Sequence, residues 1–288
     1  MKTRIKSSGI FAALSASGLL MLAVSCLPDP LEVGSVPEAR VELVVSTQMI
    51  PDQSLLVLLT RTFGALDASN DSDPQELLDL IAVNDALVTI EGPQGRDTLQ
   101  FLGNGAYGGV FIPFEEGEKY DLNINSVELG EAHATTEVKP RVDFTDVEAE
   151  LFYNGFNDTL AQIIYTFNDA PEQNWYMINV QEVERDDLIE NLLNPRAFTI
   201  LVPDADFNGN PYSESFRVFP RDYEPGDTIA VSLSNISEEY YRFMKLRIDN
   251  RFSLVEFVSE PVNYPSNIVG GKGYFNLYVP DVRFFVFE

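Results

Sequence analysis

One short stretch in the second half of the chain has residues of the right types and spacing to bind calcium. Asp204, Asp206 and Asn208 stand at alternate positions, and Gly209 follows them. Oxygen ligands at alternate positions and a glycine at the sharp turn are what a Ca²⁺ loop requires. The twelfth position, however, is Ser215 instead of a bidentate carboxylate. A polar turn between strands accounts for the same residues, so we assign no metal site and keep calcium as an open alternative.

A glycine-rich run earlier in the chain matches the G-x-G-x-x-G pattern of dinucleotide-binding sites. It spans residues 103–108 (GNGAYG). Such a site needs the run between a strand and a helix, so that the helix N-terminus meets the pyrophosphate. Here we expect one strand before it (97–102) and another after it (109–114). The run therefore predicts a hairpin turn and no bound cofactor.

The residues that nucleophilic catalysis needs are scarce. The single histidine, His133, lies in a predicted strand, and the single cysteine, Cys26, has another role, described below. No G-x-S-x-G motif occurs in the sequence. A pair of carboxylates for glycoside hydrolysis stays open, because 45 acidic residues offer many pairs. We expect a protein that is not an enzyme, since nothing in the sequence assembles a catalytic set.

A possible modification site recurs three times. The pattern Asp-Thr-apolar occurs at Thr98, Thr159 and Thr228. It resembles the O-glycosylation sequon of secreted proteins of Bacteroidota. Turn chemistry at the start of a strand also explains it, so both interpretations stay open. A mature mass equal to that of the acylated polypeptide alone would exclude glycosylation.

Composition and charge limit the classes of partner. The chain has 288 residues, a length that suggests two domains. It carries 19 Lys and Arg against 45 Asp and Glu, a formal net charge of −26. Phosphate contacts need clustered basic residues, so this charge argues against a nucleic-acid partner and against docking on anionic lipid through a basic patch. One cysteine excludes an internal disulfide and a cysteine-based zinc site.

The N-terminal segment has the features of an exported, lipid-modified protein. A basic start precedes an apolar stretch, 10–24, that is too short to span a bilayer. Small residues then precede Cys26 in the sequence LAVSC, which resembles a bacterial lipobox. We therefore predict a signal peptide over 1–25, acylation of Cys26 and a proline-containing tether over 26–40. The alternative is an ordinary secretory signal with an incidental cysteine.

From residue 41 onward the dominant signal is the period-2 alternation of β-strands. In the first half we expect strands at 41–47, 55–62, 86–91, 97–102, 109–114, 120–126 and 132–138. This series of short strands over 41–140 fits an Ig-like or transthyretin-like β-sandwich. A short helix that begins after Asp73 would lie in the long loop between the second and third strands.

A second β-rich domain is predicted over 141–288, so the chain belongs to the all-β class with one or two short helices. Its expected strands lie at 143–152, 161–168, 175–183, 197–203, 214–219, 228–234, 273–280 and 282–287. Its expected helices span 185–193 and 237–249. Four aromatic residues could line a binding surface, but strands favour aromatics, and we expect them in the core or at half-buried sheet positions: Trp175, Tyr176, Tyr240 and Tyr241.

Short pieces of the chain match, in order, those of a known family. They are the lipobox cysteine, 58–62 (LLTRT), 85–90 (DALVTI), 103–107 (GNGAY), 117–122 (GEKYDL), 206–209 (DFNG), 225–228 (PGDT), 240–241 (YY), 261–263 (PVN), 266–268 (SNI) and 273–275 (GYF). Together they make nearly the whole mature chain resemble the domain of unknown function 4249 family of Bacteroidota lipoproteins. An acidic helical insertion near 67–83 departs from the family pattern.

The resemblance implies an outer-membrane lipoprotein that is typically encoded beside a TonB-dependent transporter. It implies no catalytic residue, and it suggests that the calcium-like loop is a strand–turn feature of the family. We therefore expect a lipid-anchored binding or accessory protein that acts with such a transporter in nutrient capture or uptake, with an unknown ligand. A structural or adhesive surface protein without a transporter partner is the alternative, and an enzyme comes third.

Overall fold

The computed structural model describes residues 40–50, 54–62, 79–109, 111–155, 158–183, 197–219, 222–251 and 263–288. All of them belong to one compact unit, Ala39–Glu288. Among these residues no helix is long and apolar enough to cross a membrane. Several predicted features lie outside the described residues: the signal peptide, Cys26, the tether up to residue 39, the start of the helix after Asp73 and the helix over 185–193.

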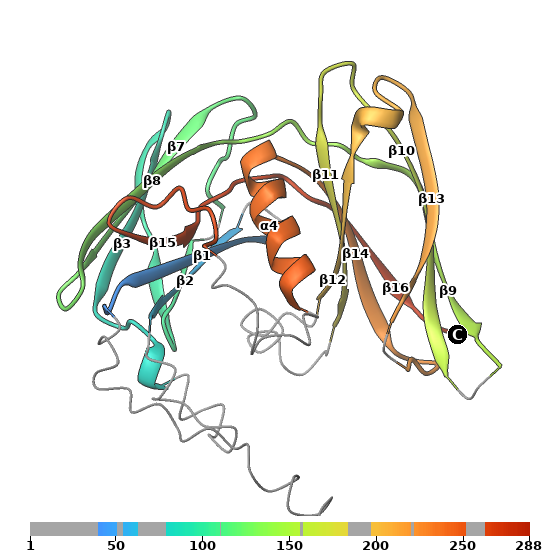
Figure 1. The fold of residues 1–288 in the computed structure, drawn as a ribbon, viewed down its shortest axis with the longest axis horizontal. Coiled ribbons are helices and arrows are strands. Elements are labelled where there is room, and N and C mark those ends of the chain that lie inside the picture. Colours follow the sequence, from blue (N-terminus) through green and yellow to red (C-terminus); the bar gives the residue numbers. More distant parts are fainter. Residues whose placement is uncertain are drawn as a thin grey trace, which may run out of the picture. The chain divides into compact units, whose positions relative to one another are not determined.

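A first β-sandwich contains all the described strands that precede residue 140 (Figure 1). One sheet has the order β15-β1-β2-β6-β5, and the other has the order β4-β3-β7-β8. The strands are β1 (Leu43–Ile50), β2 (Ser54–Arg61), β3 (Ala86–Gly92), β4 (Gly95–Thr98), β5 (Gln100–Gly103), β6 (Ala106–Gly109), β7 (Lys119–Ser126), β8 (Gly130–Glu137) and β15 (Gly271–Tyr274). Both sheets contribute buried side chains to one hydrophobic core. The predicted all-β class is thereby confirmed.

Strand β7 illustrates why the alternation was readable from sequence. Tyr120, Leu122 and Ile124 are buried, whereas Asp121 and Asn125 are exposed. Successive side chains of a strand point to opposite faces, so one face packs on the core and the other meets water.

The predicted strand 97–102 is wrong as a single element, because the chain changes sheets within it. Strand β4 pairs with β3, whereas β5 pairs with β6 in the other sheet. Leu99, between them, is buried, and its N–H donates to the Val88 carbonyl at 2.9 Å. The buried leucine therefore forms the crossing point between the two sheets.

The glycine-rich run 103–108 forms the predicted hairpin, between β5 and β6. Asn104 has φ 48° and Gly105 has φ 75°, as a two-residue turn of this twist requires. A Cβ on Gly105 would lie 2.3 Å from the Leu59 carbonyl oxygen, so the turn packs directly on β2. The predicted strand 109–114 is wrong, because β6 occupies Ala106–Gly109 and ends where that prediction begins.

A second β-sandwich follows, with sheets of order β13-β10-β9 and β12-β11-β14-β16. Its strands are β9 (Phe144–Tyr153), β10 (Thr159–Asn168), β11 (Trp175–Glu182), β12 (Ala197–Pro203), β13 (Pro211–Val218), β14 (Thr228–Ile236) and β16 (Asp281–Val286). The core between these sheets is rich in aromatic rings, including those of Tyr165, Phe167 and Tyr176. Aromatic side chains bury a large apolar area each, so they dominate the stability of this core.

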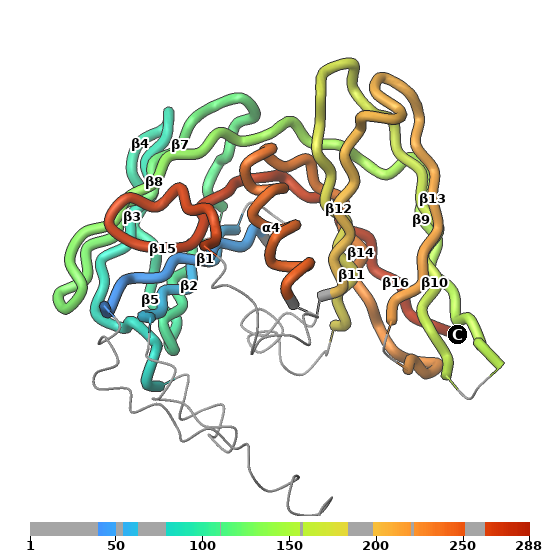
Figure 2. Tube along the Cα trace, in the orientation of Figure 1, coloured from blue at the N-terminus to red at the C-terminus, as the bar shows by residue number. Residues whose placement is uncertain are grey.

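The C-terminal part of the chain returns to the first sandwich before it enters β16 (Figure 2). Strand β15 pairs in parallel with β1, from Leu43 opposite Gly271 to Ser46 opposite Tyr274. The Asn267 side chain holds this segment, because it accepts from the Phe275 N–H at 2.9 Å and donates to the Phe275 carbonyl at 2.7 Å. The predicted strand 273–280 is therefore wrong: a short strand ends at Tyr274.

Helix α4 (Glu238–Arg251) confirms the predicted helix over 237–249. Ser237 caps it, since its Oγ accepts from the Tyr240 N–H at 3.1 Å. Tyr240 and Phe243 are buried in the core of the first sandwich, together with Met177 of β11. The residues after 140 thus supply α4 and β15 to the first core as well as the whole second sandwich.

Candidate functional site

Two loops at one end of the second sandwich are held together by the carboxylate of Asp169. This residue follows β10, and it accepts a hydrogen bond from the Tyr176 hydroxyl. Its second oxygen accepts from the N–H of Gly209, in the loop between β12 and β13, at 2.7 Å. Gly209 has φ 74°, a conformation that glycine adopts without strain. One side chain therefore fixes the β12–β13 loop to the end of β10.

A second carboxylate, that of Asp204, joins the same loops from within the protein. Asp204 is 1% exposed, and its Oδ2 accepts from the Asn174 N–H at 2.5 Å. Asn174 Oδ1 in turn accepts from the side chain of Asn235, at the end of β14, at 3.0 Å. A buried carboxylate is stable only when it receives hydrogen bonds, and the backbone N–H group supplies one here. Both loops are therefore preorganised.

This geometry explains the calcium-like motif as a structural turn. Asp204 and Asp206 lie in a single 3-10 turn, but only Asp204 is buried, and its carboxylate already binds a backbone N–H. Asp206 and Asn208 are exposed. Within the described residues, no group of three or more His, Cys, Asp or Glu side chains is arranged to hold a metal ion. The motif residues thus shape the loop.

We expect the melting temperature to be the same in excess Ca²⁺ and in excess EDTA. The reason is that Asp204 is 1% exposed and its Oδ2 already accepts from the Asn174 N–H. Thermal unfolding followed by circular dichroism in both buffers is the measurement. A ligand at 100 times its Kd would add about 2.7 kcal/mol, so a rise of several degrees in Ca²⁺ alone would contradict this structural role.

The rim of these loops combines aromatic rings with exposed carboxylates. The rings of Phe207 and Tyr212 stack with centroids 4.1 Å apart, and both residues are half-buried. Glu214 is exposed, and its Oε2 accepts from the hydroxyls of Tyr212, at 2.5 Å, and Tyr165, at 3.1 Å. Burial, and then the hydrogen bond to Glu214, raise the pKa of Tyr212 to about 12. Both hydroxyls therefore stay protonated and hold the carboxylate in place.

The two rim segments, 169–174 and 204–214, contain five acidic residues and no Lys or Arg. Aromatic rings and carboxylate oxygens can bind hydroxyl-rich or cationic ligands. Because Asp169 and the buried Asp204 already fix the loops, the carboxylates of Asp206 and Glu214 are the ones that face solvent at the rim. We call the set of Phe207, Tyr212, Glu214 and Asp206 the loop rim.

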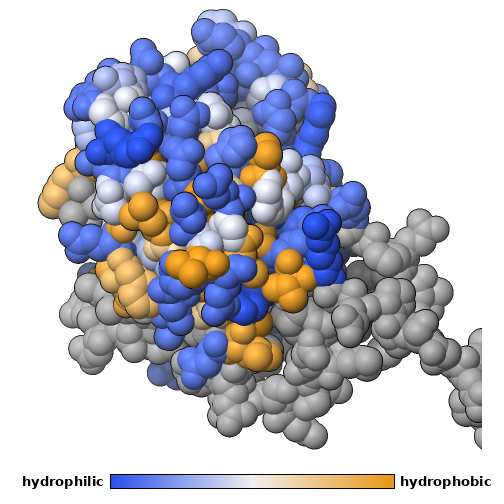
Figure 3. Space-filling view, turned by 90° about the vertical axis from the view of Figure 1, so that its left-hand side faces the viewer, coloured by the Kyte–Doolittle hydropathy of each residue, from blue (hydrophilic) through white to orange (hydrophobic). Residues whose placement is uncertain are grey.

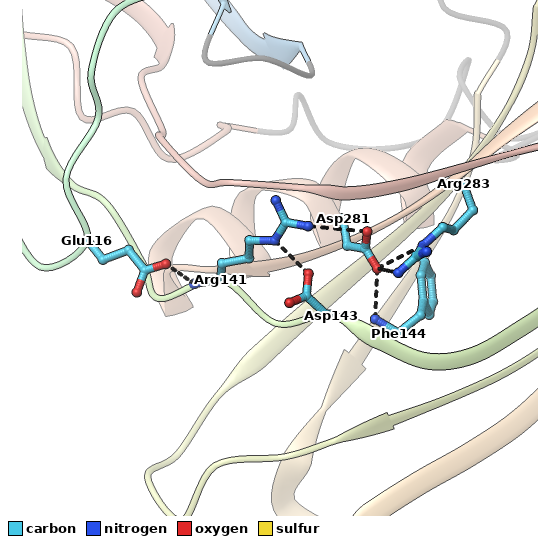
Figure 4. A network of polar contacts seen from close by, with 6 residues as sticks. All are labelled: Glu116, Arg141, Asp143, Phe144, Asp281 and Arg283. Atoms are coloured by element: carbon cyan, nitrogen blue, oxygen red, sulfur yellow. Dashed lines mark hydrogen bonds and ion pairs between the residues drawn. The ribbon is translucent and has the colours of Figure 1, made fainter.

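A separate polar network joins the segment after β8 to the last strand, β16 (Figure 4). The Asp281 side chain is 5% exposed. Its Oδ2 accepts from the Phe144 N–H at 2.9 Å and from Arg283 Nη2 at 3.0 Å, and its Oδ1 lies 3.4 Å from Arg141 Nη2. Arg141 also pairs with Asp143 at 2.6 Å. These contacts fix the entry into β9 against β16, which is a structural role.

The other residues singled out from sequence are dispersed. His133 is exposed on β8, as expected for a surface strand residue. Thr98 is exposed at the end of β4, whereas Thr159 and Thr228 open β10 and β14 and are partly buried. Cys26 lies outside the described residues. Of these residues, the four that the structure describes, His133, Thr98, Thr159 and Thr228, lie outside the loop rim.

The aromatic residues considered as surface candidates are mostly core residues. Tyr176 and Tyr240 are buried, and Trp175 and Tyr241 are partly buried. Sequence reasoning missed the roles of Glu214 in the loop rim and of Asp169, which fixes the β12–β13 loop. The contacts of Asp169 and Glu214 join segments that are far apart in the chain. The polar loop after β10 was therefore the only local sign of the site in the sequence.

Tyr240 should make the stability of the protein fall at alkaline pH. Burial raises its pKa from 10 to about 12. Tyr240 in the unfolded chain ionises at a lower pH than in the folded protein. The contribution of Tyr240 to the free energy of unfolding is therefore complete below pH 10 and is lost as the pH rises to 12. The free energy of unfolding should fall between pH 8 and pH 11 in both proteins. We expect the fall to be about 1.4 kcal/mol smaller in Tyr240→Phe than in the wild type.

Urea unfolding at both pH values tests this expectation. Tyr153→Phe is the matched control, since Tyr153 is 61% exposed. That variant should lose as much stability as the wild type. Equal losses in the wild type and in Tyr240→Phe would contradict the assignment.

Comparison with known proteins adds two findings. A family model described as "Domain of unknown function (DUF4249)" matches residues 29–282. Among solved structures, the chain is similar to a two fibronectin type-III domain segment from chicken tenascin, with 6% identity and a TM-score of 0.20; the match covers 68% of this chain and 91% of that chain. The comparison with curated proteins gave no match.

Proposed function

Because the chain belongs to the family of the domain of unknown function DUF4249, we propose that it is a lipid-anchored binding or accessory protein of the bacterial outer membrane. In this proposal it acts with a TonB-dependent transporter in the capture or uptake of a nutrient. We include the transporter because the sequence resemblance implies that members of this family are associated with such transporters.

The anchor is supported by the sequence around Cys26. This is the one cysteine of the chain, and it stands where a lipobox requires it. The family match begins at residue 29, just after it. Several acyl chains, at about 0.8 kcal/mol for each buried CH₂, would make the attachment durable. The tether then separates the anchor from β1 by a stretch with three prolines.

The observation that carries a binding role is the loop rim. Asp169 and Asp204 hold two loops through hydrogen bonds to Gly209 and Asn174. Loops that are fixed in advance lose less entropy when a ligand binds, which raises affinity. The rim combines aromatic rings with exposed carboxylate oxygens, which are groups that can bind a ligand without reacting with it.

An affinity pull-down from solubilised native membranes tests the proposal. Tagged full-length protein is compared with Cys26→Ser, which cannot be acylated. We expect one TonB-dependent transporter to co-purify with the wild type, and less of it with the variant, because the anchor confines both proteins to one membrane. Recovery of no transporter after mild detergent and cross-linking would contradict the proposal and favour the structural or adhesive alternative.

A further inference from the structure

The outer face of one sheet in the second sandwich carries no charged side chain. The sheet is β12-β11-β14-β16, and its four strands contain three charged residues, Glu182, Asp281 and Arg283. The register partners of these residues on β14 all belong to the core between the two sheets. Because successive side chains of a strand point to opposite faces, the outer face is left uncharged, although 22% of the chain is charged.

Short side chains occupy the middle of this face, on β14. Ala230 stands opposite Phe284 of β16, and Ser232 stands opposite Asn179 of β11. The longer side chains of β11 and β16 therefore extend further from the sheet than those of β14 between them. Phe284 is 62% exposed, and Val286, two residues further along the same face, is 53% exposed. The face thus has an aromatic and aliphatic side on β16 and an amide on β11.

The amide of Asn179 is held in one orientation. Its Oδ1 accepts from the hydroxyl of Thr199, its register partner on β12, at 2.7 Å. No other side-chain hydrogen bond of Asn179 occurs in the part of the chain that the structure describes. An amide nitrogen carries two N–H donors. Asn179 Nδ2 is therefore fixed by the contact with Thr199 and available to donate to a ligand.

The row of β14 side chains continues to a buried hydroxyl without a partner. Ser234 lies on the same face as Ser232, and its register partner, Met177, packs in the first core with α4. Ser234 is 1% exposed, and its Oγ makes no hydrogen bond to any described residue. An unpaired buried hydroxyl costs about 1–3 kcal/mol. A hydroxyl of a ligand, or a water that the ligand holds, would supply the missing partner.

Exposed apolar residues on the first sandwich have a different setting. Figure 3 shows the side of the molecule that carries this sandwich, where apolar side chains lie among polar ones in the lower half of the face. Apolar residues scattered in this way are normal on a protein surface. Phe284 and Val286 differ, because their register partners on β14, Ala230 and Thr228, are uncharged as well.

Six residues define what we call the uncharged face: Asn179, Thr228, Ala230, Ser232, Phe284 and Val286. We propose that the uncharged face binds a neutral oligosaccharide. The Phe284 ring packs on the apolar side of a sugar ring, and Asn179 Nδ2 donates to a sugar hydroxyl. A charged ligand would lose hydration here without meeting an opposite charge, which is costly. A ligand that is rich in hydroxyl groups and has no charge avoids this penalty.

The inference goes beyond the proposed function, since it needs no transporter and uses none of the residues of the loop rim. Purified full-length protein is applied to an array of neutral oligosaccharides, and the affinity for a retained glycan is measured by isothermal titration calorimetry. The variants are Phe284→Ala and Asn179→Ala. Phe219→Ala is the matched control, because Phe219 is also 62% exposed but follows β13, in the other sheet.

We expect Phe284→Ala and Asn179→Ala each to bind the glycan roughly tenfold more weakly than the wild type, which corresponds to about 1.4 kcal/mol. Phe219→Ala should bind as tightly as the wild type. A higher salt concentration should leave the affinity unchanged, because no charge contributes to it. Melting temperatures show that the variants are folded.

Three results would overturn the inference. The first is that the array retains no neutral glycan. The second is a retained glycan that binds as tightly to Phe284→Ala and Asn179→Ala as to the wild type, which would place the glycan elsewhere on the protein. The third is an extended peptide that binds in place of any glycan and is lost in Phe284→Ala, which would assign the face to a protein partner. The pull-down decides the transporter separately, so either proposal can fail alone.

Discussion

Gly273→Ala should lower the free energy of unfolding by about 3 kcal/mol or more, with a fall in melting temperature of roughly 6–12 °C. A Cβ at this position would lie 1.9 Å from the carbonyl oxygen of Val45 and 2.8 Å from its carbonyl carbon. Atoms of the backbone cannot rotate away as a side chain can. Strands β1 and β15 would have to separate, and the parallel pairing that holds β15 at the edge of the first sheet would be lost.

Gly226→Ala is the matched control for this prediction. Gly226 has φ 102°, against 101° for Gly273, but nothing lies within 4 Å of an added Cβ. Alanine at Gly226 should therefore cost only the strain of a positive φ, on the order of 1–2 kcal/mol. Thermal unfolding of both variants, followed by circular dichroism, separates the two effects. Equal losses would mean that the approach of β15 to β1 does not matter for stability.

Asp281→Ala should lower the free energy of unfolding by about 3–5 kcal/mol. The substitution leaves the buried Phe144 N–H without its acceptor and deprives Arg283 of a carboxylate 3.0 Å away. An unsatisfied buried donor costs its full desolvation penalty, because water cannot replace the lost bond. The entry into β9 would also lose its attachment to β16, so cooperativity should fall along with stability.

The neighbouring carboxylate offers a control within the same network. The Asp143 side chain is 59% exposed, and it pairs with Arg141 at 2.6 Å. Exposed ion pairs contribute about 0–1 kcal/mol, so Asp143→Ala should be nearly neutral. Urea unfolding of both variants at pH 7 measures the difference. A loss for Asp281→Ala as small as that for Asp143→Ala would show that the network adds little to stability.

Features governed by neighbours in the chain could be read from the sequence. The alternating faces of β7, the hairpin at Asn104–Gly105 and the helix capped by Ser237 all follow from local geometry. Period-2 alternation, positive φ at a tight turn and an N-cap each depend on a few consecutive residues. The all-β class follows from the same signals repeated along the chain.

Features governed by long-range pairing could not be read in this way. The residues 97–102 alternate as one strand would, but the pairing partners of β4 and β5 place them in different sheets. Residues 273–280 read as one strand, yet the pairing with β1 covers only Gly271–Tyr274. Which strand lies beside which depends on contacts whose partners are distant in sequence, and no local pattern encodes them.

The candidate site shows the same division. The types of residue in the loop of Asp204 and Asp206, and the polar turn that they form, could be read from the sequence. Their use depends on long-range contacts, because Asp204, which is 1% exposed, meets the N–H of Asn174, thirty residues away. A carboxylate in solution would be free to bind a cation, whereas a buried one is committed to the donor that surrounds it.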